Sequence, residues 1–181
     1  MSLPNLPLAD MSARHSGLTP AVASYYYEGA RVCLDRHHTS PVAFDLVNDG
    51  RATRTEVEWI ATDQACRDAW ANEIDTTEAG AYACVLAAGE LLRGYFAVRR
   101  AEVGTGADYY VGPPGSGTTD LEDCLRLEVS GMDHGSESML DARLREKVLQ
   151  AGEGRSNLPA LAGVVGFLVR RILLADVREA A

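Results

Sequence analysis

Two short stretches in the second half of the chain decide the expected fold: Gly104–Gly112, which reads GTGADYYVG, and Leu125–Gly131, which reads LRLEVSG. Both are strand-like, and each carries one acid, Asp108 or Glu128. A carboxylate in a strand that packs on a core is costly unless it is paired, hydrogen-bonded or bound to a metal. The two acids are therefore the first candidates for a functional site.

The segments around these two strands predict an α/β protein with a mixed central sheet. Asp75-Thr76-Thr77-Glu78 resembles a helix capping box, and Gly94 is typical of a helix C-terminus. The segment 172–177 is expected to be a further strand or a closing helix. The other expected elements of this half are a helix over 75–94, strands over 95–100, 107–111 and 124–129, a helix over 136–152 and a strand over 161–169.

The first half predicts a smaller set of elements. Residues 1–19 contain prolines and no sustained period, so they form either an ordered arm or a disordered tail. A helix is expected over 21–37, and alternation over 42–59 predicts a β-hairpin with a loop longer than two residues at Asp49-Gly50. A short helix over 63–72 follows. We expect residues 20–181 to form a single α/β domain with its core at about 76–169.

Composition limits the classes of function. The chain has 181 residues, 46% of them hydrophobic and 24% charged, which suits one globular domain. The net charge of -9 repels polyanions, so nucleic acid as a partner is disfavoured though not excluded. The apolar run over 158–169 is too short to span a bilayer, and no secretory signal is recognisable. The four widely spaced cysteines are expected to be reduced thiols of a cytoplasmic protein.

The two acids can share one site if their strands pair. Asp108 and Glu128 would then meet, and two nearby carboxylates recruit a cation such as Mg²⁺. Glu78 could supply a third oxygen, although a role as a helix cap is the alternative for this residue. Arg126 lies two residues before Glu128 on the same strand face, so an arginine bridge to both acids would satisfy them without a metal.

The element order and the two acids resemble the PD-(D/E)XK nuclease-like superfamily, whose core is restriction-endonuclease-like, over residues 76–169. The resemblance implies that Asp108, on the second core strand, and Glu128, on the third, bind magnesium. It also implies that Glu78 matches a glutamate that some branches carry on the first helix. A lysine in this superfamily helps to activate the attacking water.

One position departs from the superfamily's pattern. Ser130 stands where the third strand of the family carries its lysine, and Lys147, the chain's only lysine, is the available substitute on the next helix. The resemblance implies a magnesium-dependent phosphodiester hydrolase, a nuclease, with Asp108, Glu128 and Lys147 as catalytic residues. The alternative is a catalytically inactive relative that serves as an accessory or protein-binding subunit of a bacterial assembly, with a protein partner or a homodimer expected.

Histidines are candidate metal ligands or bases. His37 and His38 are adjacent, so they point apart on a helix, and no third ligand is spaced with them. We expect this pair to lie at a helix end. His134 follows the Glu128 strand and is expected to be a loop residue without a function, with an approach to the acid site as the alternative.

Overall fold

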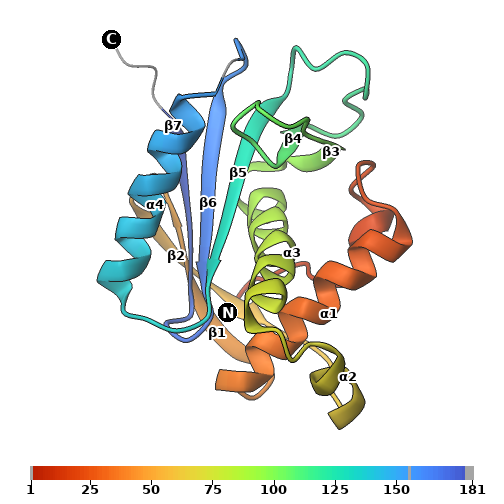
Figure 1. Cartoon of the computed structure of the whole chain (residues 1–181), viewed down its shortest axis with the longest axis vertical. Coiled ribbons are helices and arrows are strands. Elements are labelled where there is room, and N and C mark those ends of the chain that lie inside the picture. Colours follow the sequence, from red (N-terminus) through yellow and green to blue (C-terminus); the bar gives the residue numbers. More distant parts are fainter. Residues whose placement is uncertain (1, 155, 178–181) are drawn as a thin grey trace.

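The computed structural model describes residues 2–154 and 156–177 as a seven-stranded mixed open sheet with four α-helices (Figure 1). The expectation of an α/β protein with a mixed central sheet is confirmed. Residue 1 and residues 178–181, the ends of the expected arm and domain, lie outside the described residues. The elements are η1 (Met11–Ala13), α1 (Pro20–His37), β1 (Val42–Asn48), β2 (Arg51–Val57), α2 (Gln64–Ala69), α3 (Glu73–Arg93), β3 (Phe96–Arg100), β4 (Tyr109–Gly112), β5 (Leu125–Met132), α4 (Glu137–Gly152), β6 (Ala160–Gly166) and β7 (Arg171–Val177).

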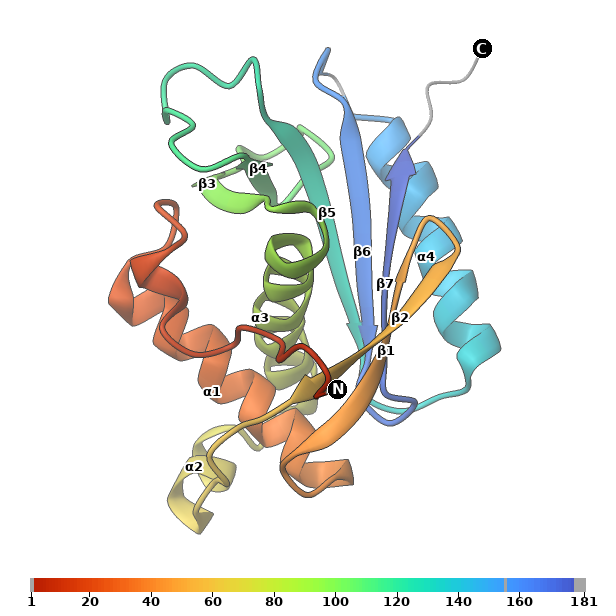
Figure 2. The same ribbon diagram turned by 180° about the vertical axis from the view of Figure 1, so that it is seen from behind.

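The strands lie in the order β2-β1-β7-β6-β5-β4-β3. β3, β4 and β5 are antiparallel neighbours, and β5 and β6 are parallel strands joined through α4. β7 runs antiparallel to β6 and parallel to β1. The β1–β2 hairpin therefore forms the edge of the sheet opposite β3. α4 covers one face of the sheet, and α3 with α1 covers the other, as the views in Figures 1 and 2 show.

The main core lies between the sheet and the pair α1–α3. α3 approaches α1 closely because glycines stand at the contact: a Cβ on Gly80 would lie 3.0 Å from Ala30 Cα, and a Cβ on Gly29 would lie 2.8 Å from Ala79 Cβ. Small residues therefore bring these two helices together. A smaller cluster, which includes Leu140 of α4, fills the opposite face.

The N-terminal arm is ordered over the residues described. Leu6 N donates to Glu56 O at 2.8 Å, and Gly17 N donates to Ala97 O at 2.8 Å. Apolar side chains of the arm, Leu6 and Leu8 among them, are buried in the main core. Of the two sequence-based alternatives, the ordered arm is therefore correct.

Several boundaries differ from the sequence-based expectations. Only Asp49 and Gly50 separate β1 from β2, so the predicted longer loop is wrong. Both have positive φ, 47° and 82°, which suits a tight two-residue hairpin turn. Asn72 caps α3 by accepting from the amides of Ile74 and Asp75, so Glu78 does not act in a capping box. Gly94 ends α3 in the left-handed conformation, as predicted.

β5 is twice as long as its neighbour β4, and this mismatch creates room for a site. β4 has 4 residues and β5 has 8. β4 pairs only with Leu125–Leu127, so the second half of β5, from Glu128 to Met132, continues beyond it. α3 contacts β5 from one face and α4 from the other. A hollow beside the two acids lies along the unpaired flank of β5, between these two helices.

Candidate functional site

A cleft of about 610 Å³ lies along the second half of β5, between α3 and α4. All the sequence-predicted site residues line it: Asp108, Glu128, Lys147 and Glu78. They come from the segment before β4, from β5, from α4 and from α3, respectively. Ser130, at the position where the resemblance asks for lysine, lies on the floor of the same cleft.

Asp108 is held in place by its neighbours. The sequence placed Asp108 inside a strand over 107–111, but in the structure it directly precedes β4. Its Oδ2 accepts from Val129 N at 2.8 Å, so the carboxylate binds the flank of β5 where β4 has ended. Its Oδ1 accepts from Tyr82 Oη at 2.8 Å and lies 3.6 Å from an Arg100 guanidinium nitrogen. These contacts fix the carboxylate at the edge of the sheet.

Glu128 is a buried acid on β5, with 7% of its side chain exposed. Its Oε1 accepts from Lys147 Nζ at 2.8 Å, and the same amino group donates to Gln150 Oε1 at 2.8 Å. Burial raises the pKa of Glu128 above its ordinary value, the hydrogen bond from Lys147 opposes that rise, and the nearby charge of Asp108 adds to it. The negative charge of Asp108 therefore acts on Glu128 within the cleft.

Arg126 does not bridge the acids. Its guanidinium donates to three main-chain carbonyl oxygens, those of Leu158, Thr105 and Ala151, at 3.1, 2.9 and 3.1 Å. Within residues 2–154 and 156–177, no hydrogen bond or ion pair joins Arg126 to Asp108 or Glu128. The alternative of an arginine bridge is therefore wrong. The reason is that Arg126 satisfies its donors at the opposite end of β5, on two loop carbonyls and on that of Ala151 in the last turn of α4.

Tyr82 and Arg100, which sequence reasoning missed, contact Asp108 and lie beside two further tyrosines, Tyr26 and Tyr109. Tyr26 and Tyr109 share a buried hydrogen bond of 2.8 Å between their hydroxyls. The Arg100 guanidinium lies 4.6 Å from the centre of the Tyr82 ring and donates to its hydroxyl at 2.9 Å. Burial and then the charge of Asp108 raise the pKa of Tyr82, so its hydroxyl stays protonated and donates. The spacing of Tyr82 one helical turn after Glu78 is the signal that could have found it.

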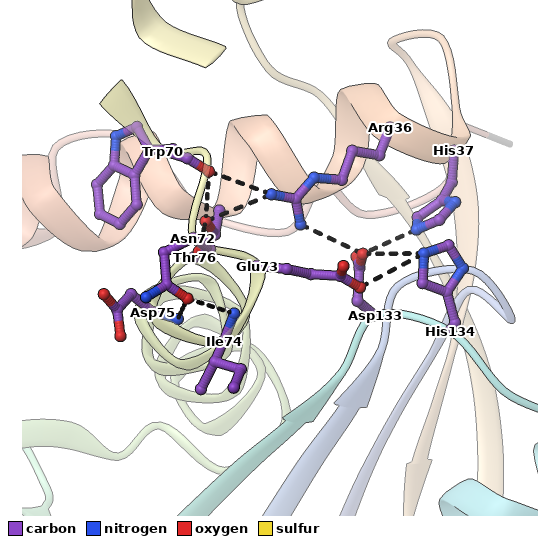
Figure 3. Close-up of polar contacts among 10 residues, drawn as sticks. All are labelled: Arg36, His37, Trp70, Asn72, Glu73, Ile74, Asp75, Thr76, Asp133 and His134. Atoms are coloured by element: carbon purple, nitrogen blue, oxygen red, sulfur yellow. Dashed lines mark hydrogen bonds and ion pairs between the residues drawn. The ribbon is translucent and has the colours of Figure 1, made fainter. Parts of the chain in front are cut away.

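A second group of polar side chains lies beside another part of the cleft, which Asp133 and His134 line and His37 does not (Figure 3). We call His37, Asp133 and His134 the His–Asp–His cluster; one ligand-type atom from each lies within 4.8 Å of the others. His37 Nε2 is 3.1 Å from Asp133 Oδ1, and His134 Nε2 is 3.4 Å from Asp133 Oδ2. Sequence reasoning found no third ligand for His37 because Asp133 is 96 residues away in the chain.

Comparison of the chain with protein-family models, with curated proteins and with solved structures found no match. Among the described residues, no helix combines the length and the apolar composition needed to cross a membrane.

Proposed function

We propose that the protein is a magnesium-dependent phosphodiester hydrolase of the PD-(D/E)XK nuclease-like type, acting on nucleic acid. Asp108 and Glu128 hold the ion, with Glu78 as a third oxygen ligand, and Lys147 orients or activates water. The observation that carries this proposal is the 2.8 Å contact between Lys147 Nζ and Glu128 Oε1 in a cleft that Asp108 and Glu78 also line. The only lysine of the chain thus lies beside the acid whose own strand has Ser130 at the basic position.

The element order and strand directions support the proposed core. α3, β3, β4, β5, α4 and β6 follow one another in the order that the superfamily resemblance implies. The two candidate acids stand on adjacent antiparallel segments, beside β4 and on β5. Function is carried by the site and not by the fold alone, so this agreement supports the proposal without deciding the chemistry.

The donor atoms suit a hard divalent cation by their type. Among the described residues, however, Asp108, Glu128 and Glu78 do not form a group whose ligand atoms all lie within 4.8 Å of one another, so their side chains would have to move to hold one ion. Asp108, Glu128 and Glu78 offer only carboxylate oxygens, which are the ligands that Mg²⁺ prefers. The raised pKa of Glu128 reflects burial and the charge of Asp108, both of which a cation between the acids would offset. A magnesium ion bound there would neutralise developing phosphoryl charge and lower the pKa of a bound water.

The chain's own residues have separate tasks in this proposal. Tyr82 and Val129 N hold the Asp108 carboxylate, each from 2.8 Å, so the ligand is oriented before a substrate arrives. Lys147 offers a proton-bearing amino group beside Glu128, which can place a water for attack on phosphorus. Arg143 also lines the cleft from α4, and its charge can attract a phosphate despite the net charge of -9.

The test is metal-dependent cleavage of single-stranded and double-stranded DNA and RNA, with Mg²⁺ or Mn²⁺, at low ionic strength. Asp108→Asn and Glu128→Gln should abolish cleavage and remove magnesium binding measured by calorimetry. Asp123→Asn, an exposed acid in the loop before β5 that does not line the cleft, is the matched control and should leave both unchanged. Absence of magnesium binding to the well-folded protein would overturn the proposal.

One observation favours the second candidate, an inactive relative that acts as an accessory subunit. Ser130 occupies the strand position of the basic residue, and Lys147 is already bound by two acceptors, Glu128 and Gln150. An amino group held in this way can be a structural ion pair. Magnesium binding without cleavage of any nucleic acid, together with a stable protein partner or homodimer in solution, would support this candidate over the hydrolase.

A further inference from the structure

The His–Asp–His cluster brings together residues from separate parts of the fold. His37 is the last residue of α1, and Asp133 and His134 directly follow β5. Glu73, the first residue of α3, completes the surroundings, with its Oε1 3.5 Å from His134 Nε2. In Figure 3 both imidazole rings lie beside the Asp133 carboxylate, and Glu73 points to the same place.

The spacing of the donor atoms is close to that of a tetrahedral metal site. Ligand atoms about 2.0 Å from a zinc ion at tetrahedral angles lie about 3.3 Å apart. The contacts of Asp133 with His37 and His134 are 3.1 and 3.4 Å, and that of His134 with Glu73 is 3.5 Å. The ligand atoms of His37 and His134 lie at most 4.8 Å apart, and this gap can close by rotation of His134, whose side chain is 63% exposed. Glu73 stands outside this group of three, and its side chain, 57% exposed, would turn inwards to become the fourth ligand.

Two side chains of the cluster are also held in fixed positions by burial and hydrogen bonds. The side chains of Asp133 and His37 are only 4% and 7% exposed. Arg36 donates to Asp133 Oδ2 at 3.2 Å and is itself held by the carbonyl oxygen of Trp70. Arg36 thereby orients the carboxylate, as partners outside the ligand shell commonly do. Its positive charge opposes a bound cation, so we expect the affinity to be lower than that of a site without it.

We propose that His37, Asp133 and His134, with Glu73 as the fourth ligand, bind a zinc-type transition-metal ion. Two imidazole nitrogens with carboxylate oxygens are a ligand set typical of zinc, whereas magnesium prefers oxygen alone. This ion is separate from the magnesium of the proposed hydrolase site. It ties the end of α1 and the start of α3 to the segment after β5, so its binding stabilises the folded chain.

The test uses the full-length protein freed of metal by a chelator that is then removed. Titration with Co²⁺ should give a single-site visible spectrum of tetrahedral intensity, which Zn²⁺ then displaces. Zinc should also raise the unfolding temperature. His134→Ala removes an exposed ligand and should weaken binding about 100-fold or more while the protein stays folded.

Two control variants make the result specific. His38→Gln changes the neighbouring histidine, whose ring nitrogen contacts Phe167 O at 2.7 Å, and should leave the cobalt spectrum unchanged. Asp108→Asn should also leave it unchanged, which separates this inference from the proposed hydrolase. Absence of cobalt and zinc binding, or binding that survives His134→Ala, would overturn the proposal. Failure of magnesium binding alone would overturn only the hydrolase.

Discussion

Lys147 Nζ lies 2.8 Å from Glu128 Oε1, so the chain's only lysine joins α4 to the buried acid of β5. Both side chains are largely withdrawn from water, with 16% of Lys147 and 7% of Glu128 exposed. An ion pair in such surroundings gains little net stability over a well-packed apolar pair, because desolvation of the two charges opposes their attraction. The proposed hydrolase gives this pair a role that stability alone does not require.

Replacing Lys147 with methionine tests this interpretation directly. We expect Lys147→Met to lower phosphodiester cleavage by about 10²- to 10⁴-fold, the usual contribution of a positioned proton-transfer group. The variant should also raise the pKa of Glu128 further, because the hydrogen bond from Lys147 lowers it. Carboxyl-carbon NMR titration measures that pKa. Arg145→Met, an exposed cation of the same helix outside the cleft, is the matched control, and an equal loss in both variants would contradict the role of Lys147.

The raised pKa of Glu128 predicts a pH dependence of stability. The folded protein holds this proton more tightly than the unfolded chain, whose ordinary value is 4.5. Protonation of Glu128 therefore stabilises the folded state. This contribution is complete below about pH 4.5 and is lost as the pH rises through the folded-state pKa. We expect the difference in free energy of unfolding between the native protein and Glu128→Gln to fall over that range. Denaturant unfolding at a series of pH values measures it, and a difference independent of pH would contradict the prediction.

Tyr82→Phe should weaken magnesium binding while the fold persists. The change removes the hydrogen bond to Asp108 Oδ1, so we expect a loss of about 10- to 100-fold in magnesium affinity. The free energy of unfolding should fall by only about 1 kcal/mol. Calorimetry and denaturant unfolding give the two values. Tyr25→Phe, at an exposed tyrosine of α1, is the comparison and should change neither of them.

Gly131→Ala tests the packing of β5 against α3 beside the cleft. A Cβ at this position would lie 2.9 Å from Ala81 Cβ and 2.9 Å from Thr77 O, so α3 has to move. We expect a loss of about 1–3 kcal/mol in the free energy of unfolding, as for other overpacked sites. Gly117→Ala is the control, because a Cβ there meets nothing within 4 Å. Equal free energies of unfolding for the two variants would contradict the prediction and would show that α3 moves at little energetic cost.

The four cysteines are free, as the sequence predicted. Burial raises the pKa of Cys33 to about 12, so this thiol carries almost no reactive thiolate at neutral pH. Cys66 is only half-buried. We expect a thiol reagent to label Cys66 first in the native protein and all four cysteines after unfolding. Rapid labelling of Cys33 in the folded protein would contradict its burial in the core.

Much of the fold could be predicted because its signals are local. Gly94 ends α3 as expected, since a left-handed residue is needed there and glycine adopts that conformation without strain. The hairpin loop was predicted too long because residue alternation locates strands but does not define where their pairing stops. The start of α3 was misplaced because Asn72, three residues before the expected start, proved the stronger cap.

The sequence by itself determined the order of helices and strands and singled out two acids that line one cleft, because periodicity and capping depend on residues close together in the chain. Only the tertiary structure decided how side chains from distant segments combine. The extension of β5 beyond β4 opens the cleft, the packing of α4 brings Lys147 to Glu128, and Arg126 turns to main-chain carbonyls instead. His37 likewise meets Asp133 only because α1 ends beside the end of β5. Such meetings depend on sheet order and helix packing, which no local pattern encodes.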